Sequence, residues 1–140
     1  MDTFAKIMNR WEEVLNQDVE LEERNKSIYS DLEGRSAIQL ELEGQPSYIV
    51  DVNSGKFRVH HGSSKTPLLN WKLPVSLFQD VMLGKHRLIY SLLDPRGTLS
   101  FDSPHFTHWN GATIIEMLYL ACEMSAKSSE ISKLVEVLEA

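Results

Sequence analysis

The spacing of apolar residues changes along this chain, and that change limits the folds it can adopt. Near the N-terminus apolar side chains recur three and four residues apart, from Phe4 through Ile7, Met8 and Trp11 to Leu15. This spacing predicts an amphipathic helix. Between Ile38 and Leu42 the spacing becomes two, with polar residues between the apolar ones, which predicts a half-buried strand. The two patterns together predict a sheet covered by helices.

Four more strands are expected after the first. Gly44-Gln45-Pro46 and Asn53-Ser54-Gly55 are short turn signals, and links of that length favour antiparallel neighbours. The strands they join carry Tyr48, Val50 and Val52 in one case and Phe57, Val59 and His61 in the other. The remaining two are expected around Leu69–Leu73 and Thr98–Phe101.

The expected helices are unusually apolar. Pro74 suits a first helical turn, and the helix that follows it buries Leu77, Phe78, Val81 and Met82 before Gly84 ends it. Further helices are expected at 18–32, 86–93, 110–124 and 128–138. The helix at 110–124 is apolar on most of its circumference, so it is buried or it lines a cavity.

A chain of 140 residues with 42% hydrophobic content fits one domain with a sizeable core. We expect N-terminal helices in 1–33, a central body in 36–122 and an amphipathic C-terminal helix in 128–138. No apolar run reaches the ~18 to 20 residues that span a bilayer. The single cysteine, Cys122, excludes an internal disulfide. A soluble, cytoplasmic protein with at most transient membrane contact is expected.

Charge is unevenly distributed along the chain. Residues 1–33 carry nine acidic and four basic side chains, residues 116–140 carry five and two, and residues 34–115 carry six and eight, with all five histidines. A mildly basic centre could attract an anionic head group. Without a basic stripe, and with acidic flanks, nucleic acid is not an expected partner.

No catalytic constellation is visible in the sequence. The chain has no Gly-x-Ser-x-Gly, Walker or dinucleotide motif. His105 and His108 could join His60, His61 or Asp102 at a metal, but metal motifs fix a third ligand and none is visible here. Cys122 lies in an apolar helix, where a cysteine is usually inert. We therefore expect no metal, no cofactor and no catalytic residue.

The order of these elements resembles the sterol-carrier-protein type 2 family. The resemblance covers residues 36–122 and is carried by the turn at Asp51–Lys56, the strand with Trp71 and the helix that closes on Leu83-Gly84-Lys85. It implies an α+β fold in which a five-stranded, mostly antiparallel sheet packs with helices around an apolar tunnel. It also implies a fatty acid, acyl-CoA or sterol as ligand.

The sequence thus predicts a non-catalytic lipid-binding or lipid-transfer protein. Lys85-His86-Arg87, at a helix junction, is the best candidate for holding a carboxylate or phosphate. The alternative is a small enzyme that uses the same cavity for a hydrophobic or polyketide-like substrate, with His86, His105 or His108 as acid or base. The predicted ligand-binding residues are Trp71, Phe78, Val81, Met82, Lys85, Arg87, Phe101, Ile114, Leu118 and Cys122.

Overall fold

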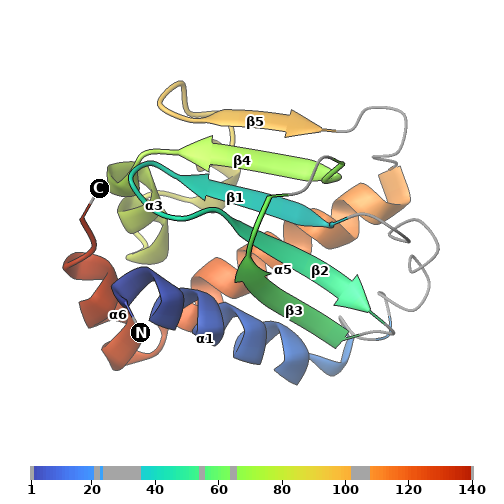
Figure 1. Cartoon of the computed structure of the whole chain (residues 1–140), viewed down its shortest axis with the longest axis horizontal. Helices are drawn as coiled ribbons and strands as arrows, with labels where there is room; N and C mark the ends of the chain where they lie inside the picture. Colours follow the sequence, from blue (N-terminus) through green and yellow to red (C-terminus); the bar gives the residue numbers. More distant parts are fainter. Residues whose placement is uncertain are drawn as a thin grey trace.

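The chain folds into a five-stranded sheet with helices packed against one face (Figure 1). The computed structural model describes residues 2–20, 23, 36–53, 56–63, 66–101 and 108–139. Its strands are β1 (Ile38–Leu42), β2 (Tyr48–Asn53), β3 (Lys56–His61), β4 (Leu69–Leu73) and β5 (Thr98–Phe101). Its helices are α1 (Thr3–Gln17), α3 (Val75–Met82), α4 (Leu88–Ser91), α5 (His108–Ala126) and α6 (Ser129–Glu136).

The strand order is β3-β2-β1-β4-β5. The β1–β2, β2–β3 and β4–β5 pairs are antiparallel, as the short turns predict. β4 instead pairs parallel with β1, with Leu40 opposite Trp71. The α+β class and the mostly antiparallel sheet expected from the sequence are therefore confirmed.

Large apolar side chains close the space between the sheet and the helices. The ring of Phe78 on α3 meets Phe4 of α1 edge-on, with centroids 5.9 Å apart, and lies 6.1 Å from the ring of Trp11. Phe4 also packs edge-on against Tyr48 of β2. Trp71 is only 1% exposed. These rings fill the part of the interior that lies between the sheet and helices α1 and α3.

Helix α1 also protects the outer edge of β3. The Asn16 side chain donates to the carbonyl of Phe57 at 2.9 Å and accepts from its N–H at 2.8 Å. Glu12 accepts from the N–H of Val59 at 2.9 Å. Because an unpaired strand edge can pair with another chain, these side chains satisfy groups that would otherwise be open to association.

The helix expected at 86–93 is shorter than predicted, running from Leu88 to Ser91. The N–H groups of Lys85 and His86 both donate to the carbonyl of Asp80. Gly84 adopts a positive φ of 76°, which closes α3 in a left-handed turn. Residues 85 and 86 therefore complete the end of α3 instead of starting α4. Helix α5 is longer than expected by two residues at each end.

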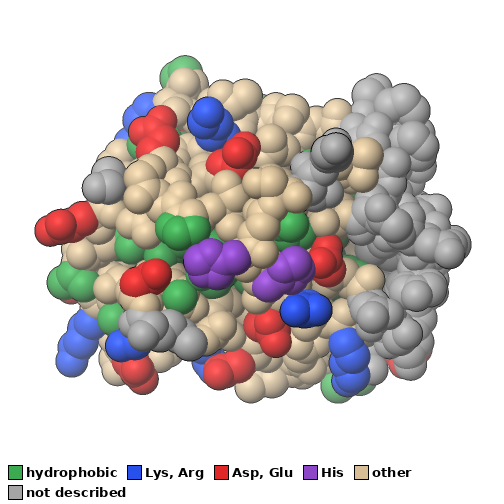
Figure 2. All heavy atoms as spheres, viewed as in Figure 1, with side chains coloured by type: hydrophobic (Ala, Val, Ile, Leu, Met, Phe, Trp, Pro, Cys, Tyr) green, Lys and Arg blue, Asp and Glu red, His purple; other side chains and the backbone are tan. Residues whose placement is uncertain are grey.

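No described helix covers the opposite face of the sheet. Figure 2 shows two histidines near the end of β3. His60 Nε2 lies 2.6 Å from Asp51 Oδ2, and His61 Nε2 lies 2.7 Å from the Tyr48 hydroxyl. Within the described ranges no three potential ligands converge on a metal position. His105, Asp102 and the side chain of His108 lie outside the described residues, as does most of the helix expected at 18–32.

Candidate ligand-binding cleft

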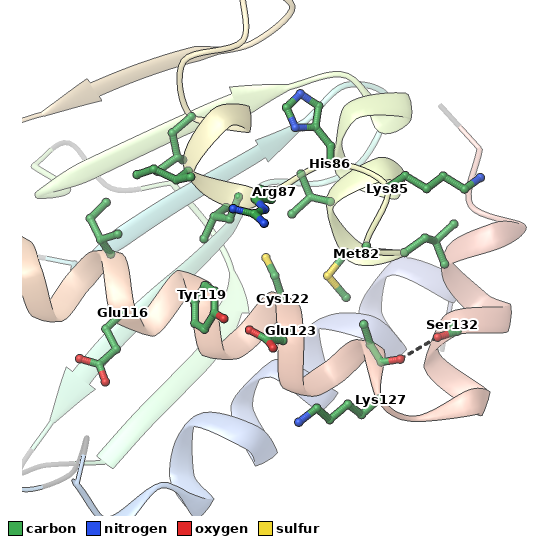
Figure 3. A pocket seen from close by; sticks show the side chains of 18 of the residues that line it. Met82, Lys85, His86, Arg87, Glu116, Tyr119, Cys122, Glu123, Lys127 and Ser132 are labelled. Atoms are coloured by element: carbon green, nitrogen blue, oxygen red, sulfur yellow. Dashed lines mark hydrogen bonds between the residues drawn. The ribbon is translucent and has the colours of Figure 1, made fainter.

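A cleft of about 1390 Å³ lies between the α3–α4 segment and helix α5, with α6 at one end (Figure 3). Pockets for small molecules commonly measure ~300 to 1000 Å³, so this one has room for a long or bulky ligand. Its lining residues are Val81, Met82, Leu83, Gly84, Lys85, His86, Arg87, Leu88, Ile89, Leu92, Ala112, Ile115, Glu116, Tyr119, Cys122, Glu123, Ala126, Lys127, Ser132 and Glu136.

Helix α5 divides its surface between the core and this cleft. Ile114, Met117, Leu118 and Ala121 form one stripe and are at most 1% exposed. A second stripe, which includes Ile115, Tyr119, Cys122 and Ala126, lines the cleft. Both stripes follow the three- and four-residue spacing of a helix. The helix is apolar nearly all round because it packs on one side and lines a space on the other.

The floor of the cleft is apolar. Met82 and Cys122, which face each other from α3 and α5 in Figure 3, are 0% and 2% exposed. Leu88 and Leu92 of the α4 segment are each 8% exposed. Burial raises the pKa of the Cys122 thiol to about 12, so the thiol stays protonated at neutral pH.

The rim of the cleft carries charges of both signs. Lys85, Arg87 and Lys127 are basic, and Glu116, Glu123 and Glu136 are acidic. Figure 3 shows the guanidinium of Arg87 extending over the cleft toward Tyr119, whereas Lys85 extends away from Arg87. The two cations that the sequence places side by side therefore do not converge on one point.

On α5, Tyr119 and Glu123 stand one helical turn apart beneath Arg87. The hydrogen bond between the Tyr119 hydroxyl and the Glu123 carboxylate raises the pKa of Tyr119, and the negative charge of Glu123 adds to that effect. Arg87 acts in the opposite direction on the same hydroxyl. Tyr119, Glu123 and Arg87 thus form one polar group at the mouth of an apolar cleft.

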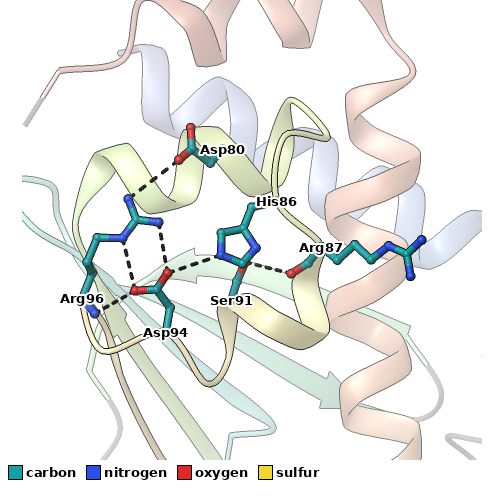
Figure 4. Close-up of polar contacts among 6 residues, drawn as sticks. All are labelled: Asp80, His86, Arg87, Ser91, Asp94 and Arg96. Atoms are coloured by element: carbon teal, nitrogen blue, oxygen red, sulfur yellow. Dashed lines mark hydrogen bonds and ion pairs between the residues drawn. The ribbon is translucent and has the colours of Figure 1, made fainter.

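The wall that carries His86 is held by a cluster of charged residues (Figure 4). Arg96 donates to both carboxylate oxygens of Asp94 at 3.1 Å and lies 3.7 Å from Asp80. His86 Nε2 is 3.3 Å from Asp94 Oδ2. The hydrogen bonds from Arg96 lower the pKa of Asp94 to about 2. Asp94 therefore stays ionised at neutral pH and ties His86 to the turn before β5.

The structure brings together half of the ligand-binding residues predicted from the sequence. Val81, Met82, Lys85, Arg87 and Cys122 line the cleft. The rest are placed elsewhere: Trp71, Phe78, Ile114 and Leu118 in the packed core, and Phe101 on β5, 44% exposed.

The sequence reasoning missed Tyr119 and Glu123. Their signal was present, because they lie four residues apart in an otherwise apolar helix and so share one side of it. The prediction for this helix rested on its apolar residues alone, so the polar pair was not singled out.

This fold is that of a sterol-carrier-protein type 2 domain, which confirms the expected fold. The sterol carrier protein domain 2 of Helicoverpa armigera superposes with a TM-score of 0.59 at 12% identity, covering 99% of this chain and 93% of that one. A structure described as UbiJ-SCP2 ubiquinone synthesis protein gives a TM-score of 0.54 at 12% identity, covering 89% and 92%. No protein-family model and no curated protein matches the sequence. At this identity the likeness concerns the fold alone.

Among the residues that the structure describes, no helix is both long enough and apolar enough to cross a bilayer.

Proposed function

We propose that this protein is a non-catalytic lipid-binding or lipid-transfer protein that holds the apolar part of a small molecule in the cleft between α4 and α5. The observation that carries the proposal is the second apolar stripe of α5, which faces a space of about 1390 Å³ that no described side chain fills. The ligand is a fatty acid, acyl-CoA, sterol or similar molecule. The two similar structures, a sterol carrier protein domain and a protein named for ubiquinone synthesis, support an apolar ligand of this kind.

The apolar floor can provide useful affinity without bond chemistry. Twelve methylenes removed from water would contribute ~10 kcal/mol, at ~0.8 kcal/mol each. Association itself costs ~4 kcal/mol or more. The remaining ~6 kcal/mol corresponds to a dissociation constant on the order of tens of micromolar. An affinity of that order suits a carrier, since the ligand must also leave, with at most transient contact between the protein and a membrane.

Acid–base catalysis by a histidine is the alternative that the sequence leaves open. Within the described lining, His86 is the histidine at the cleft, and its Nε2 is paired with Asp94. That pairing gives the ring a structural task in holding the wall. The other lining groups include no activated nucleophile, since Cys122 stays protonated. Carriage is therefore the function that the cleft supports better.

Organic extraction of the purified protein, followed by mass spectrometry, tests the proposal directly. Displacement of Nile red, an uncharged fluorescent probe, by added lipid measures affinity. Ala126→Trp should narrow the cleft and weaken probe binding at least five-fold. Met124→Trp is the matched control, because Met124 lies on the same helix, is 39% exposed and does not line the cleft. No extracted lipid together with no Nile red binding would rule out the carrier function.

A further inference from the structure

The polar group at the mouth of the cleft indicates which head group a bound lipid carries. Arg87 extends over the cleft from the α3–α4 segment, and Tyr119 and Glu123 face it from α5 (Figure 3). Glu116, Glu136, Lys85 and Lys127 also line the cleft, but Figure 3 shows Lys85, Glu116 and Lys127 extending away from Arg87. At the mouth, Arg87 from the basic centre of the sequence therefore meets Glu123 from the acidic C-terminal flank, one charge of each sign.

An anionic head group gains little at such a rim. Its attraction to Arg87 is offset by repulsion from Glu123, which lies on the opposite wall of the same mouth. The Tyr119 hydroxyl already interacts with Glu123, so an anion would have to compete with that carboxylate for the Tyr119 donor. Like charges brought close together oppose binding.

An uncharged head group that bears hydroxyls matches all three side chains. A hydroxyl can donate to the Glu123 carboxylate and accept from the Arg87 guanidinium, because it is both a donor and an acceptor. A carboxylate head can only accept. We propose that Glu123, together with Tyr119 and Arg87, makes the cleft selective for lipids with an uncharged, hydroxyl-bearing head over lipids with an anionic head. This selectivity rests on the proposed lipid-binding function, and Glu123 is its specificity-determining residue.

Two probes with the same acyl chain test the selectivity, measured by displacement of Nile red at pH 8. Myristate is ionised at that pH, whereas 1-monomyristoylglycerol is uncharged and carries two hydroxyls. Glu123→Gln removes the charge and keeps an acceptor. Glu130→Gln is the matched control, because Glu130 is exposed on α6 outside the cleft lining and its substitution changes the net charge equally.

The wild-type protein should bind monomyristoylglycerol about two- to five-fold more tightly than myristate, the range for exposed charge pairs. Glu123→Gln should raise the affinity for myristate about two- to five-fold, the range for exposed charge pairs. It should change the affinity for monomyristoylglycerol by less than two-fold. Glu130→Gln should leave both unchanged. Myristate binding as tight as or tighter than monomyristoylglycerol binding in the wild type, or equal effects of both substitutions, would overturn the selectivity and leave lipid binding intact. Failure of both probes to displace Nile red would instead refute the lipid-binding function itself.

Discussion

Replacing Cys122 by phenylalanine distinguishes a ligand cleft from an ordinary packed interior. Cys122 is 2% exposed, and its side chain points into the cleft from α5 (Figure 3). The neighbouring Ala121 is 1% exposed but belongs to the core stripe and does not line the cleft. The same helix therefore offers a test position and a matched control one residue apart.

The expected magnitudes follow from where each ring would go. At position 122 the ring can enter the cleft, so the free energy of unfolding should fall by less than ~1 kcal/mol. At position 121 the ring has no space, and overpacking should cost ~1 to 3 kcal/mol or more. A ring in the cleft excludes about three methylenes of a bound chain, worth ~2 kcal/mol, or about a 30-fold weaker affinity.

Urea unfolding would measure the stability of Cys122→Phe and Ala121→Phe, and Nile red displacement by palmitate would measure ligand affinity. We expect Cys122→Phe to lose affinity with little loss of stability, and Ala121→Phe to lose stability. Laurate, which is four carbons shorter than palmitate, should be less sensitive to the ring at position 122. If Cys122→Phe destabilises the protein as much as Ala121→Phe and leaves palmitate binding unchanged, then the space beside α5 does not hold the ligand.

Three further outcomes are expected. Asp94→Asn should lower stability at pH 7. Because the folded-state pKa of Asp94 is depressed from 3.8 to about 2, the stabilisation is present above pH ~4 and is lost as the pH falls through about 2. The difference in the free energy of unfolding between the wild type and Asp94→Asn, measured in urea, should therefore shrink toward pH 2. Equal stability of the two proteins at pH 7 would contradict a stabilising role for Asp94. In the native protein, Cys122 should resist alkylation by iodoacetamide at pH 8, since burial raises the pKa of its thiol to about 12. In urea it should react, and intact mass spectrometry would follow both reactions. Rapid alkylation of the native protein would show that the thiol is accessible. Asn16→Ala should lower the free energy of unfolding in urea by ~1 to 3 kcal/mol, because it leaves the N–H and carbonyl of Phe57 at the edge of β3 without their partner. A decrease below ~0.5 kcal/mol would mean that water replaces Asn16 there.

Local patterns predicted most of the secondary structure. The alternation at Ile38–Leu42 and the short turn after it define β1, β2 and their antiparallel pairing. The length of α4 was less predictable, because its first expected residues are used to close α3 through the carbonyl of Asp80. The sequence shows which residues can be helical, but it does not show which helix end uses a given N–H group.

The candidate cleft was only half predictable for a related reason. An apolar residue on a helix or strand can face either the core or a cavity, and its type is the same in both cases. Phe78 and Cys122 were both expected at the ligand. The structure places Phe78 against Phe4 and Trp11, and Cys122 beside Met82 at the floor of the cleft.

By itself, the sequence determined the order of helices and strands, the half-buried sheet and the presence of one helix that is apolar nearly all round. These features depend on residues that lie within a few positions of one another in the chain. Only the tertiary structure decided that β4 joins β1 in parallel, that the cleft lies between helices, and that Glu123 faces Arg87. Glu123 and Arg87 are 36 positions apart in the chain. Their encounter depends on how α5 crosses the sheet, and that crossing is set by the packing of many side chains together.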